Sequence, residues 1–389
     1  MSVYPRSSQA LLREVLRGYP VAVITGARQT GKSTLITQTL PSWRSVSLED
    51  LDMRDFAQRD PRQFLQQFPA PLVIDEAQHV PQLFSYIQTL VDRSGLMGQY
   101  VLSGSQQFSL LAGVSQSLAG RAGFIEMHPL RLKELADGGP TPRSIDTLML
   151  QGGYPAVHAR QLQPARYYAD YTASYLERDV RSLTAVHDLG SFQRFMRLCA
   201  ARTGQLLNLN GLASDSGISQ PTAAAWMNLL EAGYVVRRVA PYFRNIGKRL
   251  VKAPKLYFLD TGLCAWLLGI TTTEQLSTHY ARGALFETWV VNEALKWRAA
   301  RGDARPIYYW RDNIGTEIDI VLEQGLNLTL VEIKSGHTYQ DEWRKNLITV
   351  QRHLGESQSV SSAVIYGGEM AQLRQNTAVI PWSQLIFAD

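Results

Sequence analysis

A lysine and two glycines near the amino terminus are spaced as in a phosphate-binding loop. In VAVITGARQTGKSTLITQTL, residues 21–40, Gly26 and Gly31 bracket four residues and are followed by Lys32 and Ser33. Backbone N–H groups of such a loop turn inward around a phosphate, and the following helix presents its positive end. We expect Lys32 to reach the β- and γ-phosphates of ATP and Ser33 to ligate Mg²⁺. The predicted nucleotide-binding residues are Gly26, Ala27, Arg28, Gln29, Thr30, Gly31, Lys32, Ser33 and Thr34.

Acidic and hydroxyl side chains end two further apolar runs, in positions that suit hydrolysis of a bound nucleotide. The run PLVIDEAQ, residues 71–78, contains Asp75, which suits water-mediated binding of magnesium, and Glu76, which is placed to polarise the attacking water. In QYVLSGSQQF, residues 99–108, Ser103 or Ser105 would sense the γ-phosphate. An ordinary turn at the strand end is the alternative for each serine. Asp75 and Ser103 complete the predicted cofactor-binding set, and Glu76 is its catalytic residue.

Arg121 is a candidate for catalysis in trans. It lies in SLAGRAGFIEMHPLRLKEL, residues 117–135, where a glycine and the arginine precede an apolar run. In an oligomeric ATPase, an arginine just outside its own site can reach the nucleotide of a neighbouring subunit. We therefore expect a homo-oligomer. The alternative is an ordinary loop or helix-end charge.

Four charged residues in the carboxyl-terminal part have the spacing of a metal-dependent hydrolase. Asp319 lies in the first apolar run of EIDIVLEQGLNLTLVEIKSG, residues 317–336, and Glu332 and Lys334 end the second. Carboxylates on adjacent strands can converge on one Mg²⁺ or Mn²⁺. Lys334 points to the same sheet face as Glu332, because side chains alternate with period two. Glu287, in the helical stretch ARGALFETWVVNEALKWRA, residues 281–299, would add a further ligand.

The alternative interpretation of this segment needs no metal. A Glu-x-Lys sequence at a strand end is frequent in any sheet, and a fold can be retained for binding or scaffolding after its chemistry is lost. The sequence therefore predicts Glu287, Asp319 and Glu332 as metal ligands and Lys334 as a catalytic residue. It leaves open whether the site cleaves a phosphodiester.

Composition indicates a globular chain of several units. The chain has 389 residues, of which 45% are hydrophobic and 19% are charged, so roughly two to four domains are expected. No stretch reaches the about 18 apolar residues that span a bilayer, and the amino terminus lacks the apolar core of a signal peptide. We expect a cytoplasmic protein without membrane contact. Cys199 and Cys264 lack zinc-ligand spacing and are interpreted as structural thiols.

The middle of the chain is predicted to be helical and then to form a winged helix-turn-helix. Helical patterns with aromatic clusters run from about 130 to 205, and Arg178 and Asp179 within them are interpreted as a surface salt bridge. Two helices around 209–214 and from Ser219, followed by two β-rich stretches, outline the winged helix.

A basic block in this unit suggests a DNA partner. RRVAPYFRNIGKRLVKAPK, residues 237–255, holds seven Lys or Arg residues and no acid. We expect generic DNA contact through Arg244, Lys248 and Arg249, or else a winged helix used only for packing. On the second helix, Gln220, Thr222 and Asn228 can contact bases or phosphates, but the alanine run makes sequence-specific reading doubtful.

Several of these motifs together resemble a known family. The motifs are GARQTGKST, VIDEAQHVP, LSGSQQF, SLAGR with HPLRLKEL, QGGYPAV, KAPKLYFLDTGL, RGALFETWVVNEAL and YYWRDNIGTEIDIVLE. In this order they resemble AAA+ ATPases of bacteria and archaea that end in a nuclease-like domain of unknown function. The last part is similar to the PD-(D/E)xK nuclease core, although Ile318 stands before Asp319 where that core often has proline.

The resemblance implies an α/β protein of four parts. These are an AAA+ P-loop core (1–130), a helical lid or connector (131–203), a winged helix-turn-helix (204–260) and a restriction-endonuclease-like α/β domain (261–389). The expected function is ATP hydrolysis combined with action on DNA, with a metal-dependent nuclease at the carboxyl terminus. The alternative is an ATPase whose last domain is a catalytically inactive DNA- or protein-binding module in a defence or signalling assembly.

Overall fold

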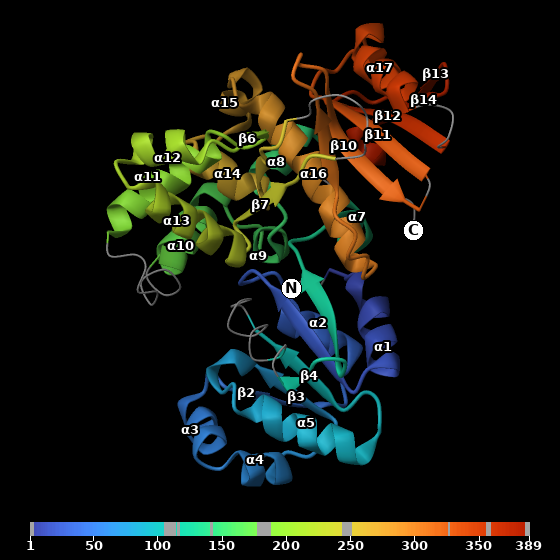
Figure 1. The fold of residues 1–389 in the computed structure, drawn as a ribbon. Coiled ribbons are helices and arrows are strands. Elements are labelled where there is room, and N and C mark those ends of the chain that lie inside the picture. The colour runs from blue at the N-terminus through green and yellow to red at the C-terminus, as the bar shows by residue number, and fades with distance from the viewer. Residues whose placement is uncertain are drawn as a thin grey trace.

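The computed structural model shows a P-loop sheet at one end of the molecule and two further sheets with many helices at the other (Figure 1). It describes residues 4–104, 114, 117–140, 143–176, 188–242, 251–325, 327–354 and 359–385. The α/β class predicted from the sequence is confirmed. In the described part of the chain, no helix has both the length and the apolar character that crossing a membrane requires.

The amino-terminal sheet is parallel and has five strands in the order β2-β3-β4-β1-β5. These strands are β1 (Val21–Gly26), β2 (Arg44–Ser47), β3 (Leu72–Asp75), β4 (Tyr100–Ser103) and β5 (Ala122–Met127). Every residue of β1 is buried, as expected for a parallel strand covered on both faces. The covering helices are α1 (Ser8–Gly18), α2 (Lys32–Thr39), α3 (Leu51–Arg59), α4 (Pro61–Gln67) and α5 (Leu83–Ser94). Since β4 lies between β1 and β3, the carboxyl ends of these three strands adjoin.

Short helices follow β5 and lead to a small antiparallel sheet. The helices are α7 (Leu132–Gly138), α8 (Ile145–Gln151), α9 (Pro155–Ala159), α10 (Pro164–Ser174), α11 (Leu189–Ala200), α12 (Leu209–Ser216) and α13 (Gln220–Ala232). Helix α13 begins as predicted, because the Ser219 hydroxyl accepts a hydrogen bond from the Thr222 N–H and Pro221 occupies the first turn. The sheet has the order β6-β8-β7, from β6 (Gln205–Leu206), β7 (Val236–Val239) and β8 (Lys255–Phe258). The winged-helix assignment stays a prediction.

The carboxyl-terminal part is built on a mixed six-stranded sheet of order β13-β14-β12-β11-β10-β9. Its strands are β9 (Tyr308–Arg311), β10 (Glu317–Gln324), β11 (Asn327–Lys334), β12 (Ser359–Tyr366), β13 (Gln372–Arg374) and β14 (Thr377–Pro381). Strands β10 and β11, which were predicted to be adjacent, form an antiparallel pair. The helices are α14 (Thr261–Leu267), α15 (Thr273–Thr278), α16 (Arg282–Ala300) and α17 (Lys345–Leu354). Helix α16 is the long orange helix that runs from this part to the P-loop unit (Figure 1).

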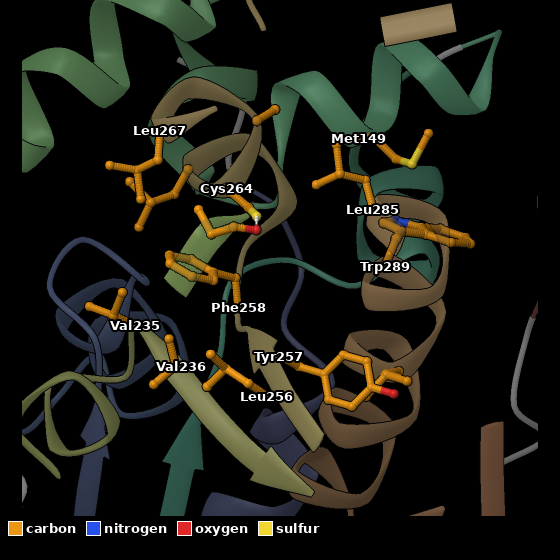
Figure 2. Close-up of a cluster of buried hydrophobic side chains, with 14 of the residues drawn as sticks. Met149, Val235, Val236, Leu256, Tyr257, Phe258, Cys264, Leu267, Leu285 and Trp289 are labelled. Atoms are coloured by element: carbon orange, nitrogen blue, oxygen red, sulfur yellow. Dashed lines mark hydrogen bonds between the residues drawn. The ribbon is translucent and has the colours of Figure 1, made fainter. Parts of the chain in front are cut away.

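One hydrophobic core joins the middle of the chain to the carboxyl-terminal sheet. Figure 2 shows side chains from β8 and α14, such as Phe258 and Cys264, gathered beside Leu285 and Trp289 of α16. Burying each large apolar side chain contributes roughly 1.5–3 kcal/mol. The core is thus continuous across residue 260, where the sequence analysis placed a domain boundary. This packing fixes β8 against α16, which carries Glu287.

Candidate functional site

The loop between β1 and α2 has the geometry of a phosphate cradle. Strand β1 ends at Gly26 and helix α2 begins at Lys32, whose Nζ donates to the carbonyl oxygens of Gly26 at 2.8 Å and Ala27 at 2.9 Å. Gly26 has φ +145°, and a Cβ there would lie 2.2 Å from the Met127 carbonyl oxygen, so only glycine fits. Gly31 has φ +93°, again in the region that favours glycine. The loop backbone therefore needs both glycines.

Asp75 is the centre of a cluster of polar groups at the carboxyl ends of β3 and β4. Its Oδ2 accepts a hydrogen bond from the Ser33 hydroxyl at 3.3 Å, and its Oδ1 accepts one from Ser103 at 2.5 Å. The strand order causes this contact, since β4 lies next to β3. Glu76 follows with φ +52°, a left-handed conformation that costs about 1–3 kcal/mol, and its carboxylate accepts a hydrogen bond from Gln78 Nε2. The oxygens of Ser33 and Asp75 are the hard donors that Mg²⁺ prefers.

A cavity of about 680 Å³ opens beside these groups. The P-loop unit contributes Arg28, Gln29, Gly31, Lys32, Ser33, Thr34, Glu49, Asp75 and Glu76 to its wall. Other parts of the chain contribute Tyr4, Arg6, Leu130, Pro155, Ala156, Ala159 and Arg160. The cavity brings six of the nine predicted loop residues together with Asp75 and Glu76, whereas Gly26, Ala27 and Thr30 are not part of its lining. The sequence analysis did not select any residue of the second set, although Leu130 lies in the HPLRLKEL motif and Pro155 and Ala156 lie in the QGGYPAV motif.

Two contacts brace the phosphate loop from outside. The Arg6 guanidinium donates to the Thr30 carbonyl oxygen, and its Nε lies 3.3 Å from Glu134 Oε2 of α7. The Tyr167 hydroxyl of α10 donates to Gln29 Oε1 at 2.9 Å. The amino-terminal segment and the helical region thus both hold the backbone that would surround the phosphates.

Arg121 lies away from its own nucleotide cavity. Its carbonyl oxygen accepts a hydrogen bond from the N–H of Val21, the first residue of β1. The phosphate loop lies at the opposite end of that strand, after Gly26. The Arg121 Nε and Nη2 lie 2.5 Å and 2.9 Å from the two Asp92 oxygens. This hydrogen bond lowers the pKa of Asp92. The role of Arg121 in trans stays a prediction about a neighbouring subunit.

The described cations of the basic block are held mainly by internal acids. Arg237 pairs with Glu126, and Arg238 pairs with Glu231 and donates to Asn228 Oδ1 at 3.0 Å. Burial raises the pKa of Glu126, but His128 and Arg237 outweigh it and bring the pKa to about 2. The predicted DNA contacts Arg244, Lys248 and Arg249 lie outside the described residues, as do Arg178, Asp179 and Ser105.

The carboxyl-terminal acids surround a lysine that the sequence analysis did not select. Lys255, at the start of β8, places its Nζ 2.8 Å from Glu287 Oε1 and 3.8 Å from Asp319 Oδ1, and it also pairs with Glu317. Its side chain is only 3% exposed. Burial lowers the pKa of Lys255, but the three carboxylates outweigh burial and raise it. Lys255 was missed because the basic block was read as an exposed wing.

The predicted strand residues have other partners. Asp319 Oδ2 accepts a hydrogen bond from the Ile333 N–H at 2.7 Å, and Glu332 Oε1 accepts one from Lys334 Nζ at 2.5 Å. Burial and then the Glu287 and Glu332 carboxylates raise the pKa of Asp319 well above its usual range. Burial likewise raises the pKa of Glu332. Asp319 and Glu332 thus lie in the same cluster as Glu287. Each of the two accepts a hydrogen bond from a different donor.

These carboxylates do not fit a divalent metal as they are arranged. Among the described residues, no three His, Cys, Asp or Glu side chains are placed to hold a metal ion. A divalent ion needs several oxygens that converge on one point at about 2.0–2.6 Å. Here the Lys255 ammonium lies among Glu287, Glu317 and Asp319. The metal site expected from the sequence stays a prediction.

Helix α16 contacts the surroundings of both sites. Glu287 lies in its first half, and Glu293 and Lys296 lie in its second. Glu293 Oε2 accepts a hydrogen bond from the Leu132 N–H at 2.9 Å, and Lys296 Nζ donates to the Leu130 carbonyl oxygen at 2.8 Å. Leu130 lines the nucleotide cavity. One rigid helix thus joins the cavity wall to the carboxylate cluster.

Three family models match the chain. They are described as an AAA domain (residues 18–136), a domain of unknown function, DUF8612 (residues 142–274), and a domain of unknown function, DUF4143 (residues 282–385). Among solved structures, the chain is similar to the Walker-type ATPase PABY2304 of Pyrococcus abyssi, with TM-score 0.46 and 15% identity over 68% of this chain and 96% of that one. A likeness to the RuvB Holliday junction branch migration motor of Thermotoga maritima has TM-score 0.30 and 15% identity, over 60% and 88% of the two chains.

Two curated relatives match over nearly the whole length. They are the uncharacterized proteins Rv2008c of Mycobacterium tuberculosis and Mb2031c of Mycobacterium bovis. Each is 30% identical over 397 residues, which covers 99% of this chain and 85% of the relative. The chain therefore belongs to the family of these mycobacterial proteins, and its AAA domain makes it a P-loop ATPase of the AAA type.

Proposed function

We propose that the chain binds ATP with Mg²⁺ in the 680 Å³ cavity and hydrolyses it with Glu76 as the general base. The observation that carries this proposal is the arrangement around Asp75, which contacts the Ser33 and Ser103 hydroxyls and precedes Glu76. A phosphate loop, an oxygen pair suited to magnesium and a carboxylate for water lie on one cavity wall. These are the parts that phosphoryl transfer to water requires.

Each side chain has a defined role in this proposal. Lys32, which now donates to two loop carbonyls, transfers its hydrogen bonds to the β- and γ-phosphates when nucleotide binds. Ser33 and Asp75 would hold the magnesium ion, which supplies neutralisation of charge on the phosphate oxygens. Glu76 accepts the proton of the attacking water, and Gln78 fixes its carboxylate. Arg160 adds positive charge from the helical side of the cavity.

The test is phosphate release by the full chain with Mg²⁺ and ATP. Lys32→Ala is expected to abolish release, because the phosphates lose their cation. Lys345→Ala removes an exposed lysine at the start of α17 and is the matched control, expected to retain wild-type release. Release that persists in Lys32→Ala would show that hydrolysis takes place elsewhere.

We propose DNA as the partner, because the chain has a net charge of +5 and contains the basic block of residues 237–255. Since Arg237, Arg238 and Lys255 are in internal ion pairs, Arg244, Lys248, Arg249 and Lys252 are the block's remaining cations. Each phosphate contact contributes about −0.9 to the slope of log affinity against log salt.

Fluorescence anisotropy with labelled DNA at several salt concentrations tests this partner. Replacing Arg244, Lys248 and Arg249 by alanine is expected to weaken binding and reduce the salt slope by about 2–3. Replacement of three exposed arginines elsewhere, Arg13, Arg17 and Arg62, serves as the control. An unchanged slope in the first triple variant would rule out the block as the contact.

For the carboxyl-terminal domain, the position of Lys255 favours a binding module over a metal-dependent nuclease. Incubation of supercoiled, linear and branched DNA with Mg²⁺ or Mn²⁺ tests this directly. No cleavage is expected from the wild type. Cleavage that both Asp319→Ala and Glu332→Ala remove would establish a nuclease instead.

A further inference from the structure

Four buried or half-buried carboxylates and one buried ammonium meet where four elements join. Glu287 comes from α16, Glu317 and Asp319 come from β10, and Glu332 comes from β11. The ammonium of Lys255 comes from β8, which belongs to a different sheet. Its contacts to Glu287 and Asp319 measure 2.8 Å and 3.8 Å.

We propose that Lys255 is the built-in cation of this carboxylate cluster and takes the place that a divalent metal ion would occupy. The charge balance supports this role. Besides Lys255, the cluster is neutralised by Lys334 beside Glu332 and by Arg311, whose Nη1 lies 2.8 Å from Glu317 Oε2. Without Lys255, Glu287 would lose its cation, and Asp319 would face Glu287 and Glu332 with only the Lys334 ammonium as counter-charge. Buried unpaired charges of this kind are strongly destabilising.

The surroundings of Lys255 hold it in this position. The Tyr257 hydroxyl, two residues along β8, donates to the same Glu287 Oε1 at 2.6 Å. The Lys255 Nζ lies 5.6 Å from the centre of the Tyr309 ring, a distance at which the ring attracts a cation. The backbone of Lys255 pairs with Leu206 of β6 and Val239 of β7, so the residue is an integral part of the small sheet. Lys255 therefore neutralises the cluster with its side chain while its backbone forms part of the small sheet, so it connects the two sheets.

The cluster also has unused capacity for a cation. Glu332 is 4% exposed, and its Oε2 accepts no hydrogen bond from any described residue. Together with Glu287, Glu317 and Asp319, it supplies hard oxygen donors. We therefore expect the cluster to become a divalent cation site when the Lys255 ammonium is removed and the carboxylates turn toward the position that it leaves. This inference does not depend on the proposed ATP hydrolysis.

The test measures binding of Mn²⁺ to the full chain without nucleotide. Binding is monitored through the decrease in the electron paramagnetic resonance signal of the free ion. Lys255→Met retains the length and apolar stem of the side chain but removes its charge. It is expected to bind one more Mn²⁺ per chain than the wild type. In Lys255→Met with Asp319→Asn, that extra ion is expected to bind at least about 10–100-fold more weakly, because loss of even an outer-shell partner of a metal ligand has an effect of that size. Any ion held at the nucleotide site is common to all of these proteins and cancels in the comparison.

A second comparison needs no substitution of Lys255. Asp319→Asn and Glu287→Gln, each made in the wild-type chain, are expected to leave Mn²⁺ binding unchanged, because Lys255 already occupies the cluster. A Mn²⁺ ion that the wild type binds and either variant loses would overturn the proposal. So would a folded Lys255→Met chain, verified by circular dichroism, that binds no additional ion. Lys255→Met that folds only when Mn²⁺ is present would support it.

Discussion

The buried ion pair between Glu293 and Lys296 gives the sharpest prediction about stability. The two side chains are 3% and 7% exposed, and Glu293 Oε1 lies 3.0 Å from Lys296 Nζ. Both also bind backbone groups of residues 130–132. Removing one partner of a buried pair leaves a buried charge without compensation and costs about 3–5 kcal/mol. At about 2–4 °C per kcal/mol for domains of 150–250 residues, Lys296→Met or Glu293→Gln should lower the melting temperature by about 6–20 °C.

A double-mutant cycle separates the pair from its individual contacts. The double variant Glu293→Gln with Lys296→Met should lose less free energy of unfolding than the sum of the two single variants, because neither charge is then left alone. The expected difference is about 0.5–3 kcal/mol. The assay is thermal unfolding followed by intrinsic fluorescence. Lys133→Met is the control, since Lys133 forms a half-exposed i,i+4 pair with Asp137, and its loss should cost at most about 1 kcal/mol. The reasoning would be refuted if each single variant lost no more stability than Lys133→Met. It would also be refuted if the stability lost by the double variant equalled the sum of the two single losses.

Two further predictions concern pH and assembly. Burial raises the pKa of Glu126, but the neighbouring cations outweigh it and hold it at about 2. A lowered pKa contributes stability that is present above the unfolded pKa of about 4.5 and is lost as pH falls toward 2. Glu126→Gln should therefore be less stable than wild type in thermal melts at pH 7, with the difference shrinking below pH 4.5, and a constant difference would contradict this. If Arg121 acts in trans, mixing inactive Arg121→Ala with inactive Lys32→Ala subunits should restore hydrolysis of ATP; no recovery in a verified mixed oligomer would exclude the role.

The phosphate loop was predictable because its chemistry is local. Backbone N–H groups within eight consecutive residues make the cradle, so spacing in the sequence is enough to locate it. Asp75 and Glu76 could be predicted for a related reason, since Asp75 ends an apolar strand, Glu76 follows it directly, and the ends of parallel strands adjoin. The contact between Ser103 and Asp75 depends on the order of the strands in the sheet. The sequence alone could therefore name Ser103 only as one of two candidate serines.

Contacts between distant segments could not be predicted in the same way. Arg6 stands in an unremarkable segment, yet it is buried against Thr30 and Glu134. Lys255 lies in a basic block whose local signal is that of a solvated loop, and only the packing of β8 against α16 turns it toward Glu287. The carboxylates were found from their strand positions, but the identity of their cation depends on tertiary packing. Local sequence therefore located the acids without showing what neutralises them.

Hydrolysis by a Glu76→Gln variant tests the central claim most directly. The substitution keeps the shape of the side chain and removes only its ability to accept the proton of water. Phosphate release should fall by about 10²–10⁴-fold, while binding of a fluorescent ATP analogue with Mg²⁺ stays at the wild-type level. Glu14→Gln, an exposed acid on α1, should leave both measurements unchanged. Phosphate release by Glu76→Gln at the wild-type rate would contradict the account.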